Sequence, residues 1–155
     1  MVKYRALTLE ELSAMEDEFV KFLVLNGIPG DDWVKLKNTN PAKAEAICES
    51  FSDVVFTKIL SNARYLERHA AKEVVSIFCD DTMMYLQGIE APDDLDVDFT
   101  DPIQFHQLKT VPPEGLLKTS STKKYADERE LEIWKMLNQG FFIADQKLYM
   151  ALFEA

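Results

Sequence analysis

The chain has few of the residues that build disulfide frameworks and phosphate loops. It contains two cysteines and five glycines among 155 residues. Two cysteines exclude a disulfide framework and a four-thiolate zinc site. Cys48 and Cys79 both fall on the apolar side of a predicted element, so we expect reduced core residues. No glycine-rich phosphate-binding motif is present, and five glycines spread along the chain are too few to form one.

Residues that could carry catalysis are also scarce. His69 and His106 are the only histidines, so any acid/base or metal scheme has to use one of them. His106 has no neighbour in the sequence that would complete a nucleophile pair. Ser120 and Ser121 lack the flanking glycines of a nucleophile elbow. These absences favour a protein that is not an enzyme, and they predict no cofactor.

Long hydrophobic runs are missing as well. The first twelve residues hold no signal-peptide core and include Glu10 and Glu11. The apolar run 19–25 is interrupted by Lys21, whereas a membrane span needs roughly 18 or more apolar residues. We therefore expect a cytoplasmic protein with no membrane partner.

Positively charged residues are scarce in the segment 70–101. The formal net charge is −10, and the segment 70–101 carries one lysine against nine acidic residues, which gives −8. A field of this sign repels nucleic acid and anionic membranes. The two predicted C-terminal helices, joined across Gly140, have the outline of a helix-turn-helix. From Ala126 onward, however, three cations face six anions, so no nucleic-acid partner is expected.

What is present is typical of a folded domain. The chain is 47% hydrophobic, and its length suits a single domain over residues 1–155. Thr8 and Glu11 form a capping-box pattern, and apolar residues at helical spacing follow as far as Asn26. A short helix carrying Trp33 comes next. Asn40 and Pro41 then begin a long helix whose pattern continues towards residue 66.

The period changes in the middle of the chain. Residues 73–89 alternate as two strands around an acidic turn at 80–82, which predicts a hairpin. An isolated hairpin is marginal in water, so we expect it to lie on helices or to pair with further strands. Residues 90–122 hold four of the six prolines and predict a long irregular segment.

Helical spacing returns from Lys123, so two closing helices are predicted, separated by a stop at 138–140. The expected fold class is α+β: a helix-rich single domain with a small antiparallel sheet and a C-terminal helical pair. His69 would follow the end of the long helix, where a cationic imidazole suits the helix dipole.

Aspartates at alternating positions form the most unusual motif. They alternate with apolar residues, which predicts a charged, solvated edge with its apolar groups turned inward. A second interpretation is a docking surface for a basic partner, including the chain's own segment 102–125. The residues are Asp93, Asp94, Asp96, Asp98 and Asp101.

A metal site is the third interpretation of this motif, with Asp94, Asp96 and Asp98 as ligands. The calcium-loop template that starts at Asp94 fails, because Phe99 stands where glycine is needed and Phe105 where glutamate is needed. With His106 added, the same residues describe a small metal-dependent enzyme or a ligand-binding protein. We keep this as the alternative function.

The C-terminus carries six consecutive apolar residues, 148–153. A helix that is apolar all round is either buried on every side or covered by a partner. Self-association, for example as a homodimer, is therefore expected at this helix. The residues predicted to contribute are Leu148, Tyr149, Leu152 and Phe153.

Several short motifs resemble a family of uncharacterised small bacterial proteins, over most of the chain. They are Tyr4-Arg5-Ala6-Leu7-Thr8, Glu10-Glu11-Leu12, Gly27-Ile28 with Trp33, Phe51-Ser52-Asp53 and Tyr65-Leu66-Glu67. The resemblance implies a small cytoplasmic protein and no activity, cofactor or catalytic residue. Residues and resemblance together favour a non-catalytic protein-interaction or regulatory module.

Overall fold

The structure, a computed structural model, describes residues 2–154 and confirms the α+β class. Within that range it has seven helices and five strands. The contacts divide the chain into two compact units, residues 1–61 and 62–155. None of the helices described is long and apolar enough to cross a membrane. The first unit holds α1 (Leu9–Ala14), α2 (Glu16–Leu25), α3 (Gly30–Thr39) and α4 (Pro41–Asn62, shared by one residue with the second unit).

The first helix begins as the sequence predicts and then breaks. Thr8 Oγ1 accepts from the Glu11 backbone N–H, and the Glu11 carboxylate accepts from the Thr8 N–H, so the capping box is present. At Met15 the backbone leaves helical geometry and its N–H bonds to Leu12, which separates α1 from α2. Asn40 caps α4 through Lys43 N–H, and Pro41 occupies the first helical position.

Aromatic rings fill the core of the first unit. Phe51 of α4 is buried, and its ring lies 5.1 Å from Phe19 and 5.3 Å from Phe22 of α2. Trp33 of α3 meets Phe19 edge to face at 5.2 Å. The apolar spacing of α2 and α4 therefore serves packing within this unit.

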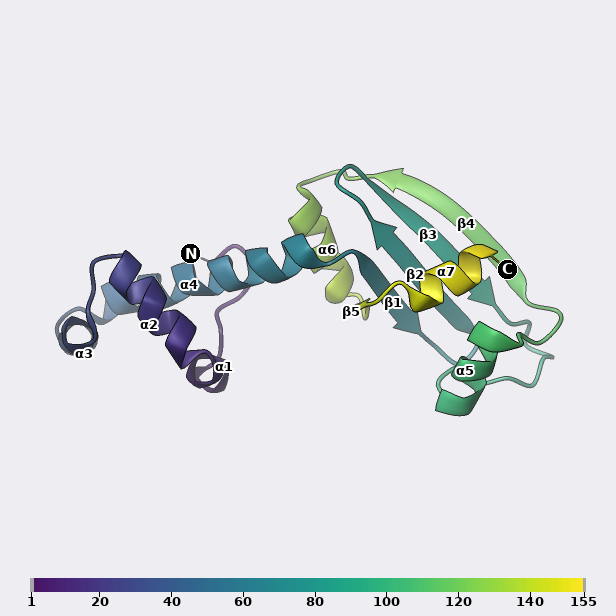
Figure 1. The fold of residues 1–155 in the computed structure, drawn as a ribbon, viewed down its shortest axis with the longest axis horizontal. Coiled ribbons are helices and arrows are strands. Elements are labelled where there is room, and N and C mark those ends of the chain that lie inside the picture. Colours follow the sequence, from purple (N-terminus) through teal and green to yellow (C-terminus); the bar gives the residue numbers. More distant parts are fainter. Residues whose placement is uncertain (1, 155) are drawn as a thin grey trace. The chain divides into compact units, whose positions relative to one another are not determined.

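The second unit is built on a five-stranded antiparallel sheet with the order β4-β3-β2-β1-β5 (Figure 1). The strands are β1 (Tyr65–His69), β2 (Glu73–Cys79), β3 (Met83–Glu90), β4 (Leu117–Lys124) and β5 (Phe142–Ala144). The predicted hairpin is the β2–β3 pair, with Cys79 opposite Met84. A lone hairpin would be only marginally stable. This hairpin pairs with β1 and β4 on its two sides and is covered by helices, as expected.

Side chains alternate between the two faces of this sheet. On one face, α5 (Pro102–Thr110) and α7 (Lys147–Glu154) cover a core that includes Val74 and Ile89. On the other face, Ile77 and Leu86 line a cavity together with α6 (Arg129–Leu137). Figure 1 shows α7 crossing the sheet. The predicted C-terminal helical pair is thus present as α6 and α7, with β5 between them.

Besides the break at Met15, the predicted secondary structure was wrong in two other segments. Residue 66 lies in β1, because α4 ends at Asn62 and the chain then pairs with β2. His69 is consequently a strand residue and does not lie at a helix end. The segment 90–122 is also more ordered than predicted, since it contains α5 and most of β4. Strand pairing and packing outweighed the local pattern in both places.

Both cysteines are free thiols. Cys79 is buried and Cys48 is partly buried. Burial raises the pKa of the Cys79 thiol to about 11 and also raises the pKa of Cys48. Neither thiol therefore has the depressed pKa of a reactive cysteine.

Candidate functional site

The acidic segment keeps its charges in solvent and its apolar residues inside. Phe99 is buried, and Leu95 and Val97 pack against the same core as α7. Asp93, Asp94, Asp96 and Asp98 are all exposed. The inward and outward alternation is as predicted, although the segment is not a strand.

Local hydrogen bonds engage two of the predicted site aspartates. Asp98 accepts from the backbone and hydroxyl of Thr100, and these bonds lower the pKa of Asp98. Asp101 is the N-cap of α5 and accepts from Gln104 N–H. His106 is exposed on α5. Within residues 2–154, no three His, Cys, Asp or Glu side chains are grouped so as to hold a metal ion.

Helix α7 presents two different faces. Leu148 and Leu152 are buried with Val74, Ile89 and Phe99. Tyr149, also buried, turns the other way and lies 5.7 Å from Tyr65, ring to ring. Of the four residues predicted for self-association, only Phe153 is largely exposed. Self-association through this helix stays a prediction. The exposed apolar side chains of α7 that could contact a second copy are Phe153 and its neighbour Met150.

An aromatic surface forms where this second face of α7 meets the sheet. Tyr65, Phe78 and Tyr85 stand opposite one another on β1, β2 and β3. The Phe78 ring stacks on Tyr65 at 5.1 Å and on Tyr85 at 5.8 Å. Tyr149 and Phe153 stack on each other at 6.1 Å. We call these five residues the aromatic surface.

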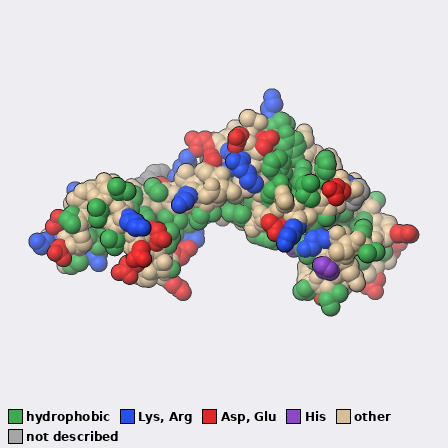
Figure 2. Space-filling view, in the orientation of Figure 1, with side chains coloured by type: hydrophobic (Ala, Val, Ile, Leu, Met, Phe, Trp, Pro, Cys, Tyr) green, Lys and Arg blue, Asp and Glu red, His purple; other side chains and the backbone are tan. Residues whose placement is uncertain are grey.

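The aromatic surface borders an open cavity of about 330 Å³, which Met150 and Asp80 also line. Figure 2 shows hydrophobic side chains gathered on the face of the second unit that carries α7, with acidic side chains beside them. The Asp80 carboxylate accepts from the backbone N–H groups of Met83 and Thr82, which lower its pKa. Its negative charge in turn raises the pKa of Tyr85. The surface therefore combines one exposed ring, Phe153, and four more deeply buried rings with one fixed anion.

Polar side chains form a row beneath α7, beside the aromatic surface. In register across four strands stand Glu67, Ser76, Gln87 and Ser120. Ser120 Oγ donates to Gln87 Oε1 at 2.7 Å. His69 Nε2 lies 2.8 Å from Glu67 Oε1, and its ring packs on Phe105 at 4.2 Å. Glu67 is buried and His69 is partly buried.

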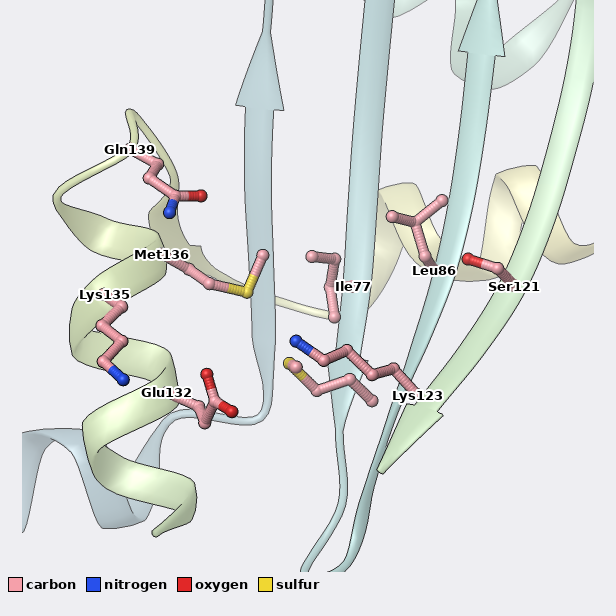
Figure 3. Close-up of a pocket in the computed structure, with 9 residues that line it drawn as sticks. Ile77, Leu86, Ser121, Lys123, Glu132, Lys135, Met136 and Gln139 are labelled. Carbon is pink, nitrogen blue, oxygen red and sulfur yellow. The ribbon is translucent and has the colours of Figure 1, made fainter. Parts of the chain in front are cut away.

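A second cavity, of about 230 Å³, lies on the opposite face of the sheet between α6 and β2–β4 (Figure 3). We call it the α6 cavity. Ile77, Leu86 and Met136 provide its apolar lining. Glu132 and Lys123 add charges from opposite walls. The Glu132 side chain is 7% exposed, and its Oε1 accepts from Ala126 N–H at 2.8 Å.

Sequence reasoning missed both cavities. The apolar pattern of the sequence predicts that Tyr65 lies in the long helix, and this hides its alignment with Phe78 and Tyr85. The register of a hairpin around 80–82 would have placed Phe78 opposite Tyr85, which was the one available signal. Nothing in the local sequence brings Ile77 and Leu86 near Glu132, because β2 and β3 meet α6 only through the folding of the sheet.

A protein-family model described as a family of unknown function, DUF6495, matches residues 1–155. Searches of curated proteins and of solved structures found no match to the chain.

Proposed function

The chain belongs to this family of unknown function, and we propose that it is a non-catalytic protein-interaction module that holds a basic segment of a partner protein on the aromatic surface. The observation that carries the proposal is the convergence of five aromatic rings and the Asp80 carboxylate on one open cavity. Exposed apolar surface rimmed by charge is characteristic of protein-binding sites.

The chemistry of the surface favours a cationic occupant. Aromatic faces carry partial negative charge and attract lysine or arginine, with about 0.5–2 kcal/mol for each contact. Phe153 is 60% exposed and lies within reach of an incoming side chain. Asp80 supplies the full charge with which such a side chain would pair. An acidic occupant would be repelled by this carboxylate, and a purely apolar one would add no cation to the backbone hydrogen bonds that it already accepts.

The acidic segment supports the same choice of partner. Leu148 and Leu152 of α7 contact it, while Tyr149 and Phe153 of the same helix contribute to the aromatic surface. The two regions therefore flank one helix. Exposed charges at Asp93, Asp94, Asp96 and Asp98 would attract a basic segment over a distance of about 8–10 Å at ordinary ionic strength. The rings and Asp80 would then hold it.

Two peptides of equal length test the proposal, one alternating lysine with serine and one alternating glutamate with serine. Titrations of the isotope-labelled full chain are followed by NMR. We expect the lysine peptide to shift resonances of Tyr85, Phe153 and their neighbours, and the glutamate peptide to shift none. Phe153→Ala and Asp80→Asn should each weaken binding fivefold or more, and Asn retains the oxygen that caps the turn.

Matched controls separate the surface from general charge and apolarity. Phe142→Ala removes another exposed ring, on β5, and Asp31→Asn removes an exposed charge in the first unit; both should leave binding unchanged. Equal losses in all four variants, or no binding of the lysine peptide, would overturn the proposal. A dimer in light scattering that Phe153→Ala dissociates would replace the basic partner with a second copy.

The remaining candidate, a metal-dependent enzyme or ligand-binding protein using Asp94, Asp96, Asp98 and His106, has no grouped donor set within residues 2–154. It would gain support if millimolar calcium, magnesium or manganese raised the melting temperature.

A further inference from the structure

The α6 cavity, on the face of the sheet opposite the aromatic surface, has two charged walls and an apolar floor. Figure 3 shows Lys123 reaching from β4 towards α6, and the Glu132 carboxylate and Met136 thioether directed from α6 towards the sheet. The floor is formed by Ile77 and Leu86, of which Ile77 is fully buried.

The two charges face the cavity without pairing. In the part of the chain that the structure describes, neither Lys123 nor Glu132 forms an ion pair with another side chain, although Lys135 on the same rim pairs with Asp127 at 3.7 Å. A buried carboxylate costs free energy unless hydrogen bonds or an opposite charge compensate it. Oε1 of Glu132 accepts a hydrogen bond from the Ala126 N–H. The other carboxylate oxygen can accept a hydrogen bond from a ligand.

Lys123 is exposed and Glu132 is buried. A ligand that pairs with both side chains and covers the apolar floor carries a positive charge, a negative charge and an apolar part. We propose that the α6 cavity binds a free α-amino acid with a medium-sized apolar side chain, such as leucine or methionine. Its ammonium group donates to the Glu132 carboxylate, its carboxylate accepts from Lys123, and its side chain rests on Ile77, Leu86 and Met136.

The size of the cavity suits this class. Sites for drug-sized molecules occupy about 300–1,000 Å³, so a cavity of about 230 Å³ fits a smaller ligand. Ser121 and Gln139 stand at the rim and offer further donors to the ligand carboxylate. An apolar floor also selects against glycine, because glycine would bury none of it.

Four small molecules test the two charges and the side chain separately. L-leucine has all three features, 4-methylpentanoate lacks the amine, 3-methylbutylamine lacks the carboxylate, and glycine lacks the side chain. Each is titrated into the full chain with labelled methionine methyl groups. Met84 and Met136 line the cavity, and Met150 on the opposite face of the sheet serves as the internal reference.

We expect L-leucine to shift the Met84 and Met136 methyl resonances, and to bind at least tenfold more tightly than any of the other three. Glu132→Gln, which keeps the acceptor for Ala126, should weaken leucine tenfold or more and leave 4-methylpentanoate unchanged. Lys123→Met should weaken leucine and 4-methylpentanoate alike. Lys124→Met makes the same change one residue along β4, where the side chain faces the other side of the sheet, and should change neither.

Other outcomes overturn the inference. Equal binding of leucine and 4-methylpentanoate would show a simple anion site, and equal binding of leucine and 3-methylbutylamine a cation site. Shifts confined to Met150, or none at 20 mM leucine, would exclude the cavity as an amino-acid site. The comparison among the four ligands uses the unmodified chain, so it holds even if a variant fails to fold. It is also independent of peptide binding at the aromatic surface.

Discussion

Leu152 and Phe153 are adjacent in α7 but differ in burial. Leu152 is 1% exposed and packs in the core with Val74 and Ile89, whereas Phe153 is 60% exposed. One apolar run thus serves both the stability of the unit and an open surface. A truncation that removed α7 would therefore take Leu148 and Leu152 from the core together with Phe153 from the surface.

We predict that Leu152→Ala lowers the free energy of unfolding by about 2–5 kcal/mol, because it leaves a cavity under α7. Phe153→Ala should cost about 1 kcal/mol or less, since it removes only the stacking on Tyr149. Urea denaturation of both variants measures the difference. Similar losses would mean that Phe153 is part of the core and unsuited to binding.

Two buried serines provide a second comparison. Ser76 Oγ, in the row beneath α7, has no hydrogen-bond partner among residues 2–154. Ser52 Oγ, in the first unit, donates to the Cys48 carbonyl at 2.8 Å and accepts from Leu7 N–H at 2.9 Å. We predict that Ser76→Ala leaves stability unchanged or raises it by about 1 kcal/mol, whereas Ser52→Ala lowers it by about 1–3 kcal/mol. Urea denaturation decides the sign; a loss at Ser76 would reveal a partner such as an internal water.

The parts of the fold that the sequence predicted correctly are those with strong local signals. The capping box at Thr8 and Glu11, the start of α4 at Pro41 and the hairpin 73–89 each depend on a few neighbouring residues. The acidic segment also kept the predicted direction of its side chains, because burying Phe99 and exposing the aspartates does not require a strand.

The rest depends on contacts between distant residues. Tyr65 reads as the end of a helix until β2 is available to pair with it, and β4 is polar on both faces, so no alternation marks it as a strand. The aromatic surface needs the β1–β2 and β2–β3 registers together, and the α6 cavity needs α6 to lie against β2 and β3. Neither site could be assembled from spacing along the chain.

The cap of α1 makes a prediction about pH. Arg5 donates to both carboxylate oxygens of Glu11, at 2.7 and 2.9 Å, and these bonds, with the Thr8 N–H, lower the pKa of Glu11 to about 2. A carboxyl whose pKa is lower in the folded state stabilises the fold above its unfolded pKa, and the contribution is lost as the pH falls towards 2.

We therefore expect wild type to exceed Glu11→Gln in stability at pH 6–7, and the gap to close between about pH 4.5 and 2. Thermal unfolding across this range measures it. Glu10→Gln removes a charge from the same turn but not from the cap, so its small effect should not follow this profile. A gap that is constant with pH would contradict the role assigned to the Arg5 contact.

Arg129, at the start of α6, joins three parts of the second unit. Its guanidinium donates to the carbonyls of Ala63, Cys79 and Asp80, the last two at 3.1 and 3.0 Å. Its side chain is largely buried. The residue therefore holds α6 against the end of β2 and against the residues that precede β1. Because α6 forms one wall of the α6 cavity, Arg129 also fixes the position of that wall.

We predict that Arg129→Met lowers the free energy of unfolding of the second unit by about 2–4 kcal/mol, because it removes the guanidinium donor from the carbonyls of Ala63 and Cys79. The Asp80 carbonyl also accepts from the Tyr125 hydroxyl. Arg64→Met, which removes an exposed pair with Asp81, should cost far less. Trp33 lies in the first unit and Trp134 in the second, so fluorescence of Trp33→Phe and Trp134→Phe backgrounds follows each unit separately. A loss of stability seen equally by both tryptophans would mean that the two units unfold together.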